Sequence, residues 1–320
     1  MTVTSPPTGV APPIPRPVAI WAALGIVYVV WGSTYLGIRV AVQAGLPPLV
    51  SAGARFLLAG LILAAVVAVR RGPSAFRSAP RQVGAAAVIG CLLLFGGNGG
   101  VMVAEQTVPS GLAALLIAAV PLWVVIWRTA TGDRPRTMTL LGVALGLGGL
   151  AMLALSGGST SGAETWGIVL VIAATMSWAT GSFFSSRIGM PADPFVSTVW
   201  EMLAAGAAMI VAGTARGELA GFEAGDVPTK GWVALAYLVV FGSIVAFTSY
   251  VWLLHSAPIS LVATYAYVNP VVAVFLGWII LSETVSLPIV LGGAIVVAAV
   301  GLVVSTERPR PATEPEPECA

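Results

Sequence analysis

Two ionisable side chains of opposite charge lie at matching places in a strongly apolar chain. Arg55 opens the stretch Arg-Phe-Leu-Leu-Ala-Gly, and Glu201 opens the related stretch Glu-Met-Leu-Ala-Ala-Gly. Each lies inside an apolar run, where a charged side chain costs about 2.5 to 3.5 kcal/mol at mid-bilayer. In a functional interpretation, Arg55 faces a cavity and attracts a substrate carboxylate, while Glu201 pairs with Arg55, binds a substrate amine or exchanges a proton. In a structural interpretation, the two form an ion pair or cap neighbouring backbone.

Aromatic and polar side chains recur at related places in the apolar runs. Trp31 and Trp178 are equivalent, and Thr34 follows the first of them. Tyr265 and Asn269 lie in a later run, just before a proline. Aromatic faces with scattered polar groups suit an amphipathic small molecule that carries a cation or an apolar part. We therefore predict that these five residues contact substrate, although ordinary helix packing would explain the same pattern.

The segment Gly96-Gly-Asn-Gly-Gly100 stands out within an apolar run. Each glycine weakens a helix by up to about 1 kcal/mol relative to alanine, so something must approach the backbone closely there. A bound substrate and a packed neighbouring helix are both possible occupants. We expect packing to explain the glycines and Asn98 to contact the cavity.

Three further ionisable residues are expected at helix ends. Arg39 and Glu105 fall near the outer ends of their runs, where a long side chain reaches the headgroups and a carboxylate reaches water. A gate role for Glu105 is left open. His255, the single histidine, falls in a predicted cytoplasmic turn. Its usual pKa range suits proton coupling, but we expect no specific role for an exposed turn histidine.

The composition indicates an integral membrane protein. Hydrophobic residues make up 58% of the chain and charged residues 9%, and the mean hydropathy is +0.96, whereas soluble domains contain about 25% charged residues. The cysteines, Cys91 and Cys319, form neither a disulfide framework nor a metal-ligand pattern. A net charge of +2 does not call for nucleic acid. Without a His-Glu-x-x-His motif or a nucleotide-binding Gly-x-x-x-x-Gly-Lys loop, we expect neither an enzyme nor a primary pump, and no cofactor or metal.

Apolar runs of about 20 residues predict membrane-spanning helices. We count ten of them, so the predicted fold class is an all-α membrane protein with ten transmembrane helices. Proline at 109 and at 258 fits the first turn of a helix and supports the two least distinct boundaries. The predicted spans are 18–41, 47–69, 83–104, 109–127, 139–155, 167–187, 195–214, 232–254, 258–280 and 285–304.

Basic residues predict the orientation, because loops rich in Lys and Arg stay in the cytoplasm. With both termini inside, nearly all basic loop residues fall on the cytoplasmic side. Residues 1–17 and 305–320, rich in proline and polar residues, are predicted to be disordered cytoplasmic tails. The basic residues that support this orientation are Arg70, Arg71, Arg77, Arg81, Arg128, Arg134, Arg136, Arg308 and Arg310.

The chain is predicted to consist of two repeats, 18–155 and 167–304, of five helices each. The segments 109–121 and 258–270 both begin and end with proline at equal spacing. The basic loop after the second helix has a net acidic counterpart after the seventh, so the second repeat is expected to be inverted. Inverted repeats are typical of secondary transporters that work by alternating access.

The same segments resemble a known family. Trp31-Gly-Ser-Thr-Tyr35, Pro47-Pro48 and Arg55-Phe-Leu-Leu-Ala-Gly60 are followed by Val108-Pro-Ser-Gly-Leu-Ala-Ala114, Asn269-Pro270 and Leu281-Ser-Glu-Thr284. In this order they resemble the EamA family of the drug/metabolite transporter superfamily, in detail its YedA-like exporters. The resemblance implies ten helices in two repeats, a bacterial inner (plasma) membrane location, and export of small metabolites such as amino acids or drugs. Asp133 is a departure, because the family more often has Glu there.

We therefore predict a secondary active transporter that exports a small metabolite or drug, with amino acids and related amphipathic metabolites as the expected class. Exchange for protons is an open possibility. The alternative is a passive channel or a lipid scramblase, from which uphill accumulation of substrate would distinguish a transporter. The expected partners are a small-molecule substrate and the lipid bilayer, with no nucleic acid. The sequence does not indicate an oligomeric state.

Overall fold

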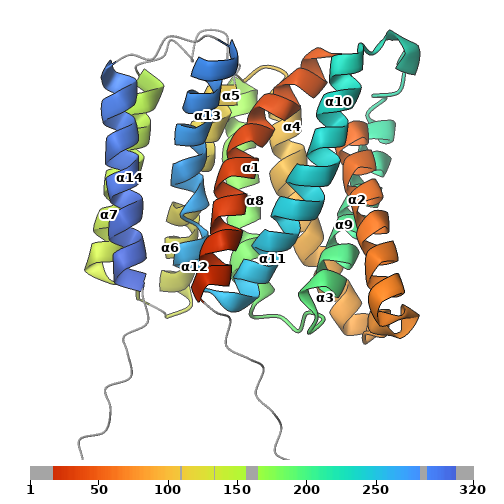
Figure 1. Cartoon of the computed structure of the whole chain (residues 1–320), viewed down its shortest axis with the longest axis horizontal. Coiled ribbons are helices and arrows are strands. Elements are labelled where there is room, and N and C mark those ends of the chain that lie inside the picture. Colours follow the sequence, from red (N-terminus) through yellow and green to blue (C-terminus); the bar gives the residue numbers. More distant parts are fainter. Residues whose placement is uncertain (1–16, 109, 133, 156–164, 282–286, 308–320) are drawn as a thin grey trace, which may run out of the picture.

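The computed structural model describes residues 17–108, 110–132, 134–155, 165–281 and 287–307, and within them the chain forms helices and no strand. The predicted tails, Asp133 and the Ser-Glu-Thr segment at 282–284 fall almost wholly outside these ranges. The helices form one bundle (Figure 1). In chain order they are α1 (Pro17–Gln43), α2 (Pro48–Arg71), η1 (Pro73–Phe76), α3 (Pro80–Gly90), η2 (Cys91–Gly99), α4 (Gly100–Ala104), α5 (Ser110–Ile117), α6 (Val120–Ala130), α7 (Thr137–Leu155), α8 (Thr165–Ser185), α9 (Pro194–Ala215), η3 (Ala224–Asp226), α10 (Thr229–Tyr237), η4 (Leu238–Val245), α11 (Ala246–Ser256), α12 (Ile259–Val262), α13 (Tyr265–Leu281) and α14 (Leu287–Glu307).

Within the described residues, six helices are long and apolar enough to cross a membrane. They are Pro17–Gln43, Pro48–Arg71, Pro80–Ala104, Thr165–Ser185, Pro194–Ala215 and Thr229–Ser256. The other predicted spans contain shorter apolar helices: Val120–Ala130, Thr137–Gly149, Ile259–Ala273 and Val290–Val303.

Two predicted spans, 109–127 and 258–280, are broken helices rather than continuous ones. The first divides into α5 and α6 and the second into α12 and α13. Pro121 lies in the first turn of α6, and proline has no backbone N–H to bond to the preceding turn. At the second break, the Thr264 hydroxyl donates to the Leu261 carbonyl at 2.5 Å, a local bond that competes with the helix.

The third long helix of each half contains a π-helical segment that the sequence analysis did not predict. In the first half η2 lies between α3 and α4, and in the second half η4 lies between α10 and α11. A π-helical turn accommodates an extra residue within a helix and is frequent at functional sites. The two segments prove to lie on either side of the same buried side chain, as described below.

Helix α2 packs along α9 at one edge of the bundle, and α7 packs along α14 at the opposite edge (Figure 1). Glycines bring α2 and α9 into backbone contact. A Cβ atom on Gly53 would lie 2.7 Å from the carbonyl oxygen of Gly206, and one on Gly206 would lie 2.9 Å from that of Gly53. Small residues at such crossings are the usual means of helix association in a membrane.

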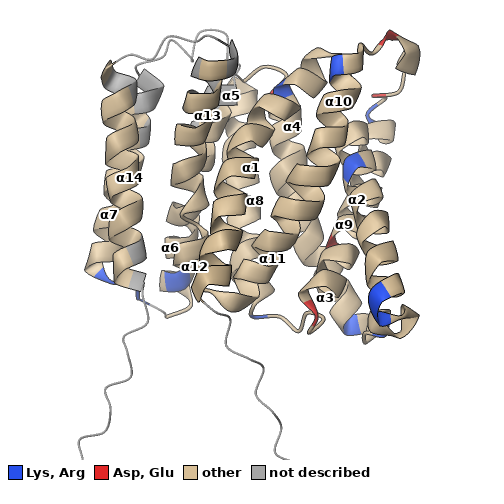
Figure 2. Ribbon diagram, in the orientation of Figure 1, with Lys and Arg blue, Asp and Glu red and all other residues tan. Residues whose placement is uncertain are grey.

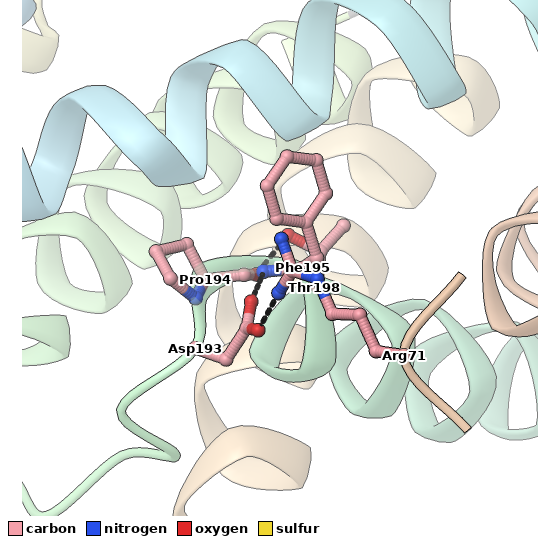
Figure 3. Close-up of polar contacts among 5 residues, drawn as sticks. All are labelled: Arg71, Asp193, Pro194, Phe195 and Thr198. Atoms are coloured by element: carbon pink, nitrogen blue, oxygen red, sulfur yellow. Dashed lines mark hydrogen bonds and ion pairs between the residues drawn. The ribbon is translucent and has the colours of Figure 1, made fainter. Parts of the chain in front are cut away.

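Charged residues link α2 and α9 at both ends of their contact. At the end of α2, Arg71 forms an ion pair with Asp193, whose other carboxylate oxygen accepts from the Phe195 N–H at 2.9 Å and caps α9 (Figure 3). At the opposite end, Glu218 accepts from the backbone N–H groups of Leu49 and Val50, at 2.8 and 3.0 Å, and so caps α2. Each helix therefore has its N-terminus capped by a carboxylate that lies next to the end of its partner.

Basic residues gather at the end of the bundle where α2 and α6 finish (Figure 2). Helix α1 begins and α14 finishes at that same end (Figure 1). The acidic loop that precedes α10 lies at the opposite end (Figure 2).

Candidate functional site

A small cavity lies at the centre of the bundle. Its volume is about 50 Å³, much less than the roughly 300 to 1,000 Å³ of most ligand pockets. Its lining includes Trp31, Thr34, Asn98, Trp178 and Tyr265, five residues that the sequence analysis selected as substrate contacts. The remaining lining residues are Tyr35, Ile38, Gly97, Val101, Ile117, Val120, Ala174 and Thr175.

An aromatic cluster forms one wall of this cavity. The Trp31 ring lies with its centroid 5.3 Å from that of Trp178, 4.9 Å from that of Tyr250 and 5.1 Å from that of Tyr265. The indole N–H of Trp31 donates to the Gly242 carbonyl at 3.2 Å, and that of Trp178 donates to the Tyr250 hydroxyl at 3.0 Å. Because these donors are used within the wall, the rings present mainly their apolar and π surfaces to the cavity. Tyr250 belongs to no motif, so its place in the cluster could not be predicted from the sequence.

Arg55 is buried behind this wall, with 1% of its surface exposed. Its Nε donates to the Ser243 hydroxyl at 2.7 Å, and its Nη1 lies 3.4 Å from the Asn98 side-chain oxygen. The first partner belongs to η4 and the second to η2, so the guanidinium connects the two π-helical segments. The carbon at the centre of the guanidinium lies 4.6 Å from the centroid of the Phe56 ring.

The expected ion pair between Arg55 and Glu201 is absent. Among the residues that the structure describes, no carboxylate forms an ion pair with Arg55. Glu201 is buried as well, but its Oε1 accepts from the Ser197 hydroxyl one turn earlier in α9, at 2.9 Å, and its Oε2 has no hydrogen-bond partner. Burial of an ion without a counter-ion costs several kcal/mol. The charged form of Arg55 is therefore unfavourable here, and the side chain lies next to Asn98, which lines the cavity.

Asn269 and Glu201 do not line the central cavity. The Asn269 amide nitrogen, oriented toward the backbone, donates to the carbonyl oxygens of Tyr265 at 3.1 Å and Tyr28 at 3.2 Å. Asn269 therefore ties α13 to α1 through backbone carbonyl groups.

Gly96, Gly97 and Gly100 pack against α8, which confirms the expectation that helix packing explains the glycines. A Cβ atom on Gly97 would lie 2.6 Å from the Trp178 ring, and one on Gly100 would lie 3.0 Å from the Ala174 Cβ. Asn98, in the middle of the run, lines the cavity. The run thus brings Trp178 close to η2 and leaves one amide at the cavity surface.

The expectation that Glu105 lies beside water is wrong. Its side chain is 2% exposed, and neither carboxylate oxygen has a hydrogen-bond partner. The turn that follows Glu105 packs against α8, since Thr107 and Val108 lie against Gly167. His255 does lie exposed near the end of α11, where its Nδ1 is 2.8 Å from the Val251 carbonyl oxygen.

In the described part of the chain, no three or more His, Cys, Asp or Glu side chains come together in a way that could hold a metal ion. A second internal cavity, of about 10 Å³, lies beside Tyr267 and has room for about one water molecule. The central cavity with its aromatic wall and buried guanidinium is therefore the candidate site.

Comparisons with known proteins agree with this architecture. The inner membrane transporter YedA of Escherichia coli (strain K12) is 42% identical over 287 residues, which cover 89% of this chain and 90% of YedA. A probable amino-acid metabolite efflux pump of the same organism is 29% identical over 167 residues, 51% of this chain and 52% of the pump. A solved crystal structure at 20% identity has a TM-score of 0.71 over 92% of this chain and 98% of its own, which shows the shared fold alone. The family model described as the EamA-like transporter family matches residues 18–155 and 165–305, and the chain therefore belongs to that family.

Proposed function

We propose that the protein is a secondary active transporter that exports a small amphipathic metabolite with a carboxylate group, such as an amino acid, by alternating access. The observation that carries this proposal is Arg55, a buried guanidinium without a carboxylate partner among the described residues, one side chain away from the central cavity. A substrate carboxylate would supply the missing counter-charge, and arginine binds carboxylates through paired N–H donors. The rings of Trp31, Trp178 and Tyr265 would hold the apolar or cationic part of the substrate.

The relative that is a probable amino-acid metabolite efflux pump supports this substrate class. The small volume of the cavity supports a closed conformation, because about 50 Å³ holds a few water molecules but no amino acid. Opening of the bundle toward one side would enlarge the cavity and expose the guanidinium.

We further propose ten membrane crossings arranged as two inverted repeats, 18–155 and 167–304. Equivalent elements support this, since the second long helix of each half, α2 and α9, pack against each other and a π-helical segment lies in the third long helix of each half. The basic end of the bundle would then lie in the cytoplasm of a bacterial cell, with both termini, and the transporter would reside in the inner membrane, as the name of the YedA relative states.

A single cysteine at Ser74, introduced after Cys91 and Cys319 are replaced, tests this orientation. Ser74 lies exposed in η1, at the basic end of the bundle. We expect a membrane-impermeant maleimide to label Ser74→Cys in inside-out vesicles and not in intact cells. Labelling in intact cells at the level of a known outer control would reverse the orientation.

Glu201 is the proposed proton-exchanging residue, since its buried carboxylate has one oxygen without a partner. We expect cells with the wild-type protein to accumulate a compound in the medium that cells with Glu201→Ala, at equal membrane levels, do not. Mass spectrometry of the medium measures this, with Glu223→Gln, which alters an exposed carboxylate, as the matched control. A compound exported equally by wild type and Glu201→Ala would remove Glu201 from the mechanism.

The alternative functions are a passive channel and a lipid scramblase. Neither accumulates a compound against its concentration gradient, whereas a secondary active transporter does. Purified protein in liposomes should accumulate the identified compound against its gradient when a pH gradient is imposed. Equilibration without accumulation, in both the presence and absence of the pH gradient, would favour the channel.

A further inference from the structure

A third hollow, wider than the two cavities described above, opens at the end of the bundle opposite the basic residues. Its volume is about 490 Å³, and its lining includes Val42, Gln106, Glu218, Glu223 and Asp226. We call this hollow the vestibule. Its lining contains three acidic residues and no basic residue.

Two segments of the chain line both the central cavity and the vestibule, and we call the side chains between the two hollows on these segments the layer. On α1, Ile38 lines the central cavity and Val42 lines the vestibule, one turn later. On α4, Val101 lines the central cavity, and in the turn that follows α4, Gln106 lines the vestibule. On this second segment Glu105 lies between Val101 and Gln106 and directly precedes Gln106.

Glu105 is poorly satisfied in this layer. It is buried, and neither of its oxygens accepts a hydrogen bond from the described residues. The charged group that acts on it is Arg39 of α1, which forms no ion pair with it, and the other titratable neighbour is Tyr35. Helices α8 and α2 also pack against α4. Helix α8 contains no titratable side chain.

The arginines of α2 do not form an ion pair with Glu105 either. Arg55 binds Ser243 and Asn98, and Arg71 pairs with Asp193 at the far end of the helix beside Arg70. A carboxylate removed from water without hydrogen-bond donors is unfavourable while it is charged, and protonation removes that cost. The closed layer therefore favours a neutral Glu105, whereas contact with water in the vestibule favours the charged form.

We propose that Glu105 is a proton-binding site in the outer gate of the transporter, which takes up a proton from the vestibule as the gate closes over the central cavity and releases it as the gate opens. The proposal rests on the alternating access proposed above. The bound proton comes from water in the vestibule and returns to it, so acid on that side favours the closed gate. Arg39 stabilises the charged form and so limits how strongly the gate depends on pH.

Cysteine accessibility tests this gate without knowledge of the substrate. In a background that carries Cys91→Ala and Cys319→Ser, Val101→Cys reports on the central cavity and Ala220→Cys reports on the vestibule. A membrane-impermeant thiol reagent is applied to intact cells from about pH 5.5 to about pH 8, and the labelling rate at Val101→Cys is divided by the rate at Ala220→Cys. The ratio removes the dependence of thiol reactivity on pH that the two positions share, and the same ratio measured in Glu105→Gln reports the part that comes from the burial of Val101→Cys.

We expect this ratio to rise several-fold with pH, and by no more than about tenfold per pH unit, because one proton is involved. Glu105→Gln, which stays neutral, should keep the ratio low at every pH. Glu105→Asp should preserve the rise, and Arg39→Gln should increase it at high pH, because the closed gate would then bury a carboxylate without its cation.

A ratio that does not change with pH in the wild-type background would overturn the proposal, and so would an unchanged rise in Glu105→Gln. If Glu105→Gln gives no folded protein, Arg39→Gln decides the question: a steeper rise with pH than in the wild type supports the proposal, and an equal rise in the two overturns it. If Ala220→Cys reacts only in inside-out vesicles, the proposed orientation is wrong, and the same ratios measured in those vesicles test the gate independently.

Discussion

Replacement of Arg55 by methionine is expected to abolish transport while the protein remains folded. Methionine fills a similar length of space but removes the charge and the bonds to Ser243 and Asn98. Loss of a hydrogen bond to a charged group costs about 1.5 to 3 kcal/mol, so a carboxylate substrate should bind roughly ten- to a hundredfold more weakly or worse. Removal of a buried cation without a counter-ion should leave the thermal stability unchanged or raise it.

Arg55→Lys is the matched control for this prediction. Lysine keeps the positive charge but lacks the planar fork of donors that reaches two partners, so we expect partial activity. The measurements are export of the identified compound, its binding to purified protein, and the thermal unfolding of both variants. Normal export by Arg55→Met would show that Arg55 does not bind substrate, and a fall in its thermal stability with normal export would make Arg55 a structural residue.

Gly90→Ala is expected to have the largest effect on stability. Gly90, at the end of α3, lies directly against the backbone of α9, and an added Cβ would lie 2.5 Å from the Cα and 2.8 Å from the carbonyl carbon of Glu201. Both atoms belong to the backbone and cannot rotate away. Overpacking of this kind typically costs about 1 to 3 kcal/mol, and the displacement would also move the Glu201 carboxylate.

Gly84→Ala is the control, because Gly84 lies in the same helix and a Cβ there would meet nothing within 4 Å. Alanine stabilises a helix by up to about 1 kcal/mol relative to glycine, so this variant should be as stable as the wild type or more stable. Thermal unfolding in detergent measures both variants. Equal unfolding temperatures for Gly90→Ala and Gly84→Ala would mean that α3 and α9 can separate without cost at this contact.

The sequence predicted the places of the helices well, because each span depends on a local run of apolar residues. It also identified residues that meet at the central cavity, since Trp31 and Trp178 recur at equivalent places and Asn98 interrupts a run of glycines. These signals are readable within a window of a few residues. The structure then brings Trp31, Asn98 and Trp178 together from α1, η2 and α8.

The features that the sequence did not predict depend on contacts between distant parts of the chain. Ser243 binds Arg55 across 188 residues, and no motif marks it. The position of Glu105 next to Gln106 and Thr107 predicts a polar helix end beside water, but Glu105 is buried. Its burial follows from the packing of that turn against α8, which local composition does not reveal. The absence of an Arg55–Glu201 pair likewise depends on other contacts, because Arg55 bonds to Ser243 and Asn98 and Glu201 accepts from Ser197.

The two π-helical segments also bear on the descent of the chain. An extra residue in one helical turn is what a single-residue insertion leaves behind. Segment η2 begins 11 residues after Pro80 and η4 begins nine residues after Thr229, so the two lie at nearly the same place in the third long helix of each half. One insertion in an ancestral half, followed by duplication, accounts for both of them. Two separate insertions after the duplication would have had to occur at nearly the same place twice. On this account, the irregular turn is older than the two-repeat chain, and the arginine that bridges its two copies became possible only after the halves had come together.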